Sequence, residues 1–157
     1  MGSSTIPAAN AAASDNWLLV STATMSGAQT LAFTSISGYA KLKVVYSGDF
    51  AFNLSACRIN NDNTNKYAFV GQTATGSIGQ SSLSNTAITS TTYQTFIWTI
   101  LSCDNSNLKT YSISAYGSGA GSADVTGIYQ ATASVTSLNF TWDTAPTGTV
   151  RLYGVAA

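Results

Sequence analysis

The segment Tyr39-Ala-Lys-Leu-Lys-Val-Val-Tyr46 decides the fold class, because its side chains alternate between two faces. Positions 40, 42, 44 and 46 are apolar or aromatic, whereas positions 39, 41, 43 and 45 include two lysines. A period of two is typical of a strand with one buried side and one solvent-facing side. We therefore predict a half-buried strand that places Tyr39, Lys41 and Lys43 on its outer face.

Short runs of the same character recur along the chain at intervals of roughly ten residues, the spacing of a sandwich or a barrel. Turn-forming residues separate them, among them Ser47-Gly48-Asp49 and the run 60–65, and we expect long loops over 74–91 and 117–127. The predicted strands are 17–23, 30–36, 39–46, 50–59, 67–73, 92–101, 108–116, 128–133, 134–142 and 149–155. The sequence thus predicts an all-β fold, a two-sheet antiparallel β-sandwich of jelly-roll type.

A chain of 157 residues favours one domain, and we place a single β-sandwich domain at 16–157. Residues 1–15 are small and polar with an alanine-rich tract at 8–13, which is too short to hold as an isolated helix. We expect an extended N-terminal arm there. The first residues show neither the basic nor the apolar region of a secretory signal, so we expect synthesis and assembly in a cytoplasm.

The charge content excludes several classes of function. Six basic and six acidic residues make the chain only 8% charged and neutral overall, and it contains neither histidine nor glutamate. A neutral chain lacks the basic surface that nucleic acid or an anionic membrane requires, and no apolar run is long enough to span a membrane. Without histidine, imidazole catalysis and histidine-ligated metal sites are absent. We expect no enzyme, no cofactor and no metal site.

All six aspartates lie in or beside turns rich in serine, asparagine and glycine, so we interpret them as turn residues rather than as a catalytic carboxylate pair. The pattern Asn60-x-Asp62-x-Thr64 spaces its oxygen ligands as a calcium loop does. It lacks the glycine and the terminal glutamate of such a loop, so we predict a hairpin turn.

Cys57 and Cys103 form no metal-binding pair, because 46 residues separate them. Two buried, reduced thiols are the simpler expectation. A disulfide within or between chains is the alternative, and it requires an oxidising setting after assembly.

Aromatic side chains are frequent, with eight tyrosines and three tryptophans. On alternating strand faces such residues are more typical of a core or a subunit interface than of a sugar-stacking platform. We single out Trp17, Tyr129 and Tyr153 as candidates for an interface or a glycan contact.

Two stretches resemble a group of tailed-bacteriophage virion proteins. The closing run Gly148-Thr-Val-Arg-Leu-Tyr-Gly-Val155 resembles a terminal strand of that group, and the runs 39–44, 58–62 and 67–68 resemble its central motifs. In this group a β-sandwich module forms a head decoration, a head fibre or a piece of a tail fibre. The resemblance covers residues 17–157 and implies a structural, non-enzymatic protein of the virion.

Our first hypothesis is a capsid decoration (cement) protein, a homotrimer bound to the major capsid protein on the head surface. The second is a tail or tail-fibre component that binds a host surface glycan through its aromatics and loops. A free lectin is a third and more distant hypothesis, because it predicts a secretory signal and the first residues do not show one. If decoration is right, deletion of residues 1–15 should weaken capsid binding and leave the fold intact.

Overall fold

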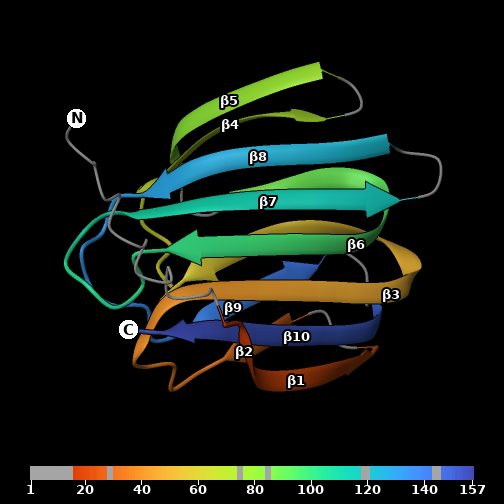
Figure 1. Cartoon of the computed structure of the whole chain (residues 1–157). Coiled ribbons are helices and arrows are strands. Elements are labelled where there is room, and N and C mark those ends of the chain that lie inside the picture. Colours follow the sequence, from red (N-terminus) through yellow and green to blue (C-terminus); the bar gives the residue numbers. More distant parts are fainter. Residues whose placement is uncertain (1–15, 28–29, 74–75, 84–85, 118–120, 143–145) are drawn as a thin grey trace, which may run out of the picture.

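The computed structural model describes residues 16–27, 30–73, 76–83, 86–117, 121–142 and 146–157 (Figure 1). This part of the chain contains no helix, and hence none with the length and hydropathy that a membrane span requires. The predicted N-terminal arm, residues 1–15, lies outside the described residues.

Ten strands make up the fold, and all their pairings are antiparallel. They are β1 (Leu18–Ser26), β2 (Thr30–Phe33), β3 (Tyr39–Ile59), β4 (Tyr67–Thr73), β5 (Gly76–Leu83), β6 (Thr86–Leu101), β7 (Lys109–Gly117), β8 (Gly121–Tyr129), β9 (Leu138–Trp142) and β10 (Thr147–Ala156).

The strands form two antiparallel sheets that pack against each other, which confirms the predicted β-sandwich and is compatible with a jelly-roll description. The larger sheet has the order β1-β10-β3-β6-β7-β8, and β4 and β5 continue it past β8. The second sheet lies behind it in Figure 1 and contains β2, β9 and the last part of β3. Strand β3 therefore takes part in both sheets.

The predicted faces of segment 39–46 are confirmed for its buried side. Leu42, Val44 and Tyr46 are fully buried, as are Phe96 and Trp98 of β6 in the same layer. Register explains the match, because β3 and β6 pair Val44 with Trp98 and Tyr46 with Phe96, so their inward positions coincide.

Aromatic rings from both sheets meet in the core. Phe140 of β9 contacts Trp98 of β6 in an edge-to-face arrangement with ring centroids 5.5 Å apart. Tyr46 of β3 lies 6.4 Å from Trp142 of β9, and Phe140 lies 6.0 Å from Phe96. Such contacts stabilise a core beyond the apolar area that they bury. These five aromatic residues thus hold the two sheets together.

Three predicted boundaries are wrong. The turn at Ser47-Gly48-Asp49 is absent, since β3 runs through it from Tyr39 to Ile59. The loop predicted at 74–91 contains β5 and the start of β6. The strand predicted at 128–133 begins at Gly121 and ends at Tyr129, so Asp124 lies on a strand rather than in a turn. In each case polar, flexible residues form a strand because another strand supplies hydrogen-bond partners: β10 for Ser47 and Gly48, β4 for β5, and β7 and β4 for β8.

The outer face of the larger sheet is rich in hydroxyl groups. One row of outward side chains crosses seven strands, and its members are Leu19, Tyr153, Lys43, Thr99, Ser112, Thr126 and Val70. The next row contains Thr22, Arg151, Val45, Ile97, Ser114, Asp124 and Gln72. In these two rows the only charged side chains are Lys43, Arg151 and Asp124.

Candidate binding site

Tyr39 does not lie on the outer face, where the alternation of segment 39–46 places it. Its ring packs against the core and covers Gly154 of β10, an inward position of that strand. The pairing of β3 with β10 shifts register between Val155 and Ala156, next to Tyr39, and this irregularity breaks the alternation. The prediction for Tyr39 was therefore wrong.

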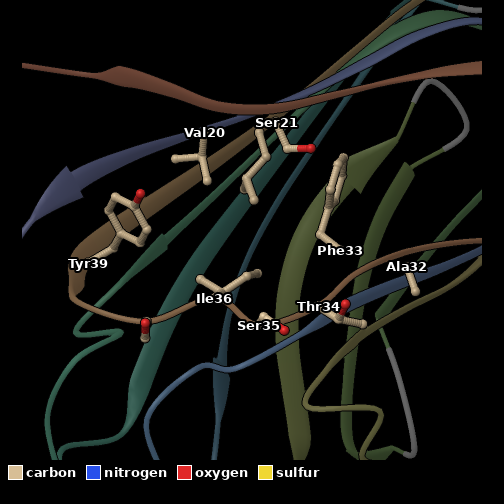
Figure 2. A pocket seen from close by; sticks show the side chains of 10 residues that line it. Val20, Ser21, Ala32, Phe33, Thr34, Ser35, Ile36 and Tyr39 are labelled. Carbon is tan, nitrogen blue, oxygen red and sulfur yellow. The ribbon is translucent and has the colours of Figure 1, made fainter.

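A pocket of about 460 Å³ opens beside Tyr39, between β1 and β10 on one side and β2 with the segment 34–37 on the other. We call it the edge pocket. Figure 2 shows Tyr39 at one end of it and Phe33 at the other. Its apolar lining consists of Val20, Ala32, Phe33, Ile36 and Leu152. Its hydroxyl-bearing lining, besides Tyr39, consists of Ser21, Thr34, Ser35 and Ser37.

A second hollow of about 320 Å³ adjoins the edge pocket and shares Ile36, Ser37 and Tyr39 with it. We call it the end pocket. It lies against the turn after β6 and the segment before β9, which contribute Asp104 and Thr136. Tyr39 thus borders both hollows, and we take the two together as the candidate binding region.

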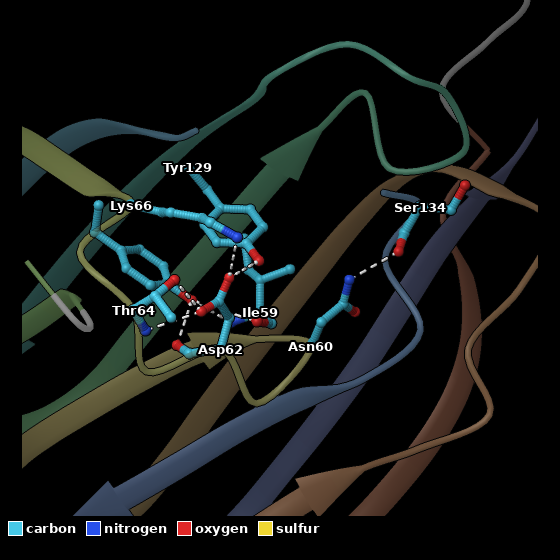
Figure 3. A network of polar contacts seen from close by, with 8 residues as sticks. Ile59, Asn60, Asp62, Thr64, Lys66, Tyr129 and Ser134 are labelled. Atoms are coloured by element: carbon cyan, nitrogen blue, oxygen red, sulfur yellow. Dashed lines mark hydrogen bonds and ion pairs between the residues drawn. The ribbon is translucent and has the colours of Figure 1, made fainter. Parts of the chain in front are cut away.

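Asp62 is the centre of a polar network between the β3–β4 connection and β8 (Figure 3). Its carboxylate accepts hydrogen bonds from the Thr64 backbone N–H at 2.9 Å, from the Thr64 hydroxyl and from the Tyr129 hydroxyl at 2.7 Å. Lys66 Nζ lies 3.1 Å from Oδ2. Desolvation raises the pKa of Asp62, but these hydrogen bonds together hold it well below its usual range.

The same connection is tied to the segment before β9 by Asn60. Its side-chain nitrogen donates to the Ser134 carbonyl at 2.9 Å, and its side-chain oxygen accepts from the Thr136 backbone N–H at 2.7 Å. Asn60 and Asn61 both have positive φ, a conformation that asparagine tolerates better than most residues. The predicted turn at 60–65 is confirmed, although it joins β3 to β4, which are not paired, and so is not a hairpin. Because the Asp62 oxygens are engaged within the protein, the network is structural.

Lys109 is fully buried at the start of β7. Its Nζ donates to the carbonyl oxygens of Asn105 at 2.7 Å, Asn107 at 2.6 Å and Thr132 at 3.2 Å. Burial lowers the pKa of Lys109, while Cys103 and Asp104 nearby act in the opposite direction. Through these hydrogen bonds the ammonium group joins the β6–β7 turn to the segment after β8.

Two of the three aromatic candidates stay at the surface. Trp17 is half-buried, and Lys43 Nζ lies 4.0 Å from the centroid of its ring, a cation–π contact. Tyr153, also half-buried, is paired in register with the same Lys43. The structure thus brings Trp17 and Tyr153 together around one lysine on the outer face.

Tyr129, the third candidate, is only 2% exposed, so the structure contradicts its assignment as a surface contact. Its ring packs on Tyr67 with centroids 4.8 Å apart, and its hydroxyl donates to Asp62. Desolvation, followed by the Asp62 carboxylate, raises the pKa of the Tyr129 hydroxyl. Tyr129 falls on the inner face because it pairs with the buried Tyr67 of β4 and the buried Lys109 of β7.

Cys57 and Cys103 are both free, buried thiols. Burial raises the pKa of Cys57, and burial raises the pKa of Cys103 to about 12. The Cys103 thiol lies 3.4 Å from the Ile100 carbonyl oxygen. Thiols held protonated and away from solvent are unreactive, so neither cysteine is part of a candidate site.

Within the described residues, no three cysteine, aspartate or other metal-binding side chains gather as a metal site requires. Sequence reasoning missed both the edge pocket and the buried Lys109. The sequence carries no signal for Lys109, because its three acceptors are backbone carbonyl oxygens, which every residue has. A scan against models of protein families found no match, and a search of curated proteins found none either.

Proposed function

We propose that the protein is a structural component of a bacteriophage virion, a decoration protein that binds the head surface as a homotrimer. The outer face of the larger sheet is the observation that supports this most directly. Its two central rows are dominated by serine, threonine and apolar side chains, with only Lys43, Arg151 and Asp124 charged. Short side chains lose little rotamer entropy when they are ordered at a contact, so such a face suits permanent packing against other subunits.

The hydrogen bonds of two ionisable residues support a non-enzymatic role. Asp62 and Lys109, two ionisable residues with shifted pKa values, are each committed to hydrogen bonds that hold loops in place. An active site normally leaves its shifted groups free to face a substrate. In this protein the pKa shifts of Asp62 and Lys109 come from hydrogen bonds and burial in the folded structure.

Electron cryo-microscopy of the particle that carries the protein tests this proposal. We expect density for a β-sandwich at many regular positions on the head, in contact with the major capsid protein. A few copies confined to the tail would overturn the decoration role and favour the second candidate, a tail or tail-fibre module that binds a host glycan. The surface pairing of Trp17 and Tyr153 around Lys43 is the observation that favours this second candidate.

The predicted N-terminal arm gives a separate test. We expect a variant that lacks residues 1–15 to keep its far-ultraviolet circular dichroism spectrum and to bind stripped capsids more weakly than the full chain. Weaker binding follows if the arm supplies part of the contact with a neighbouring subunit. Equal occupancy of both forms on the capsids would refute a role of the arm in attachment.

A further inference from the structure

We propose that the edge pocket binds a short neutral saccharide, with the Tyr39 ring as the surface on which one sugar ring stacks. This inference goes beyond the structural role proposed above, which requires no ligand. It also concerns a different place from Trp17 and Tyr153, which lie on the outer face. Four features of the pocket carry it: its size, its lining, the support of Tyr39 and the backbone of Ser35.

The size of the pocket fits a small ligand. Its volume of about 460 Å³ lies within the range of roughly 300–1,000 Å³ that is usual for small-molecule sites. The end pocket adds about 320 Å³ on the other side of Tyr39. A ligand longer than one sugar ring can therefore continue past the tyrosine into the second hollow.

The residues that line the pocket indicate the chemical class of its ligand. Side chains with hydroxyl groups lie among apolar ones on both sides of the pocket: Ser21 with Val20 and Leu152 on one side, and Thr34, Ser35 and Ser37 with Phe33 and Ile36 on the other. None of the described residues that line the edge pocket is charged, so a phosphate or a carboxylate would lose its hydration without an ionic partner among them. A purely apolar ligand would leave the hydroxyl groups unpaired. Sugars combine an apolar ring face with a rim of hydroxyl groups, and they match both parts of the lining.

Tyr39 is held in place before any ligand arrives. A Cβ atom on Gly154 would collide with Cδ1 of the Tyr39 ring, so the glycine allows the ring to lie directly on β10. Tyr39 also packs on the core cluster. A ring that is already fixed loses little conformational entropy when a ligand stacks on it.

Ser35, on the edge of the pocket, has φ of 59°, in the left-handed region. For a residue other than glycine this backbone costs about 1 kcal/mol or more, and such strained residues are found disproportionately at binding sites. The conformation belongs to the segment 34–37, which lines the pocket.

An added β-strand from another chain is the competing occupant. The edge strand β1 borders the pocket, but its pairing with β10 shifts register between Leu19 and Ser21. Such a bulge interrupts the regular row of backbone groups that an added strand needs. A compact ligand therefore suits this place better than an extended peptide.

The test is binding of the full chain to an array of neutral and acidic oligosaccharides, followed by titration calorimetry with the best neutral saccharide. Thr34→Arg fills the pocket from an exposed position and should weaken binding at least about tenfold, a loss of ~1.4 kcal/mol. Thr24→Arg, on the outer face of β1, is the matched control and should bind as the unchanged chain does. Tyr39→Ala should also abolish binding, and its melting temperature shows whether it remains folded.

Four results would overturn the inference. The first is no neutral saccharide bound at millimolar concentration. The second is binding that Thr34→Arg leaves unchanged. The third is binding of acidic glycans alone, lost in Lys43→Ala, which assigns the ligand to the outer face. A change of oligomeric mass in Thr34→Arg with no saccharide bound would assign the pocket to a second copy. None of these results bears on whether the protein occupies the phage head, which electron cryo-microscopy decides.

Discussion

At the scale of single residues, Asp62 joins the β3–β4 connection to β8, and its contribution to stability depends on an ionised carboxylate. The hydrogen bonds from Thr64 and Tyr129 favour its charged form, so its pKa in the folded state lies below the value of about 4 expected in the unfolded chain. Between these two pKa values the unfolded state binds more protons. The contribution of Asp62 to stability is therefore fully present above the unfolded pKa and is lost as the pH falls through the folded one.

We accordingly expect Asp62→Asn to lower the free energy of unfolding at neutral pH by about 2 kcal/mol, the usual worth of a hydrogen bond to a charged group. The gap to the unchanged chain should narrow as the pH falls from about 5 to about 2. Urea unfolding at several pH values measures both. Asp124→Asn, exposed on β8, is the control and should change little. A gap that is independent of pH would contradict the argument.

Lys109 presents the opposite case, a buried cation that satisfies three carbonyl oxygens. Lys109→Met fills similar space but leaves these acceptors without a donor, and we expect a loss of about 3 kcal/mol in unfolding free energy. Lys43→Met, which removes only a surface cation–π contact, should cost less than about 1 kcal/mol. Chemical denaturation compares the two variants. Equal losses of unfolding free energy in the two variants would show that the three hydrogen bonds of Lys109 do not stabilise the fold.

Whether the sequence predicts the position of a side chain depends on which contacts decide that position. The buried faces of Leu42, Val44 and Tyr46 followed from alternation alone, because a period of two is local. The positions of Tyr39 and Tyr129 did not, since a register shift with β10 decides the first and pairing with the buried Tyr67 of β4 decides the second. Lys109 required knowledge of which carbonyls converge on it, and those come from two separate segments.

At the scale of elements, the length of β3 is the main departure from expectation. Ser47-Gly48-Asp49 has the composition of a turn, yet Gly48 lies within a strand and pairs with Gly148 of β10. A Cβ atom at Gly48 would collide with the Thr147 carbonyl oxygen and with the Tyr46 hydroxyl, which donates to that oxygen at 2.9 Å. The glycine is thus required by close packing rather than by a turn.

This argument predicts that Gly48→Ala costs about 3 kcal/mol of unfolding free energy, because a backbone oxygen cannot move aside as a flexible side chain can. Gly27→Ala is the matched comparison. Its Cβ meets nothing within 4 Å but its φ is 79°, so we expect a cost of about 1 kcal/mol from backbone strain alone. Thermal melts of both variants measure the difference. Equal costs would mean that the β3–β10 contact is looser than described.

The strands that sequence reasoning missed share one physical cause. Residues 76–83 and the first part of 86–101 are rich in serine, threonine and glycine, which is the composition of a loop. They become strands because β4 and the second part of β3 offer hydrogen-bond partners. Backbone hydrogen bonds to a neighbouring strand do not require alternation of apolar and polar side chains, so these segments carry no periodic signal. The sandwich class, which rests on the stronger apolar runs, is confirmed, whereas the number of strands agrees only because two predicted strands merge into β3 and β5 was not predicted.

At the scale of the whole molecule, β3 links the two sheets: it pairs with β10 and β6 in one and with β9 in the other. Trp98 and Trp142 lie in the core between them. Neither sheet can therefore unfold alone, and we expect tryptophan fluorescence and far-ultraviolet circular dichroism to give coincident urea curves. Trp17, the third tryptophan, lies at the surface, so Trp17→Phe leaves only core reporters. In that variant, fluorescence that changes before the circular dichroism would show that the sheets separate while their strands persist.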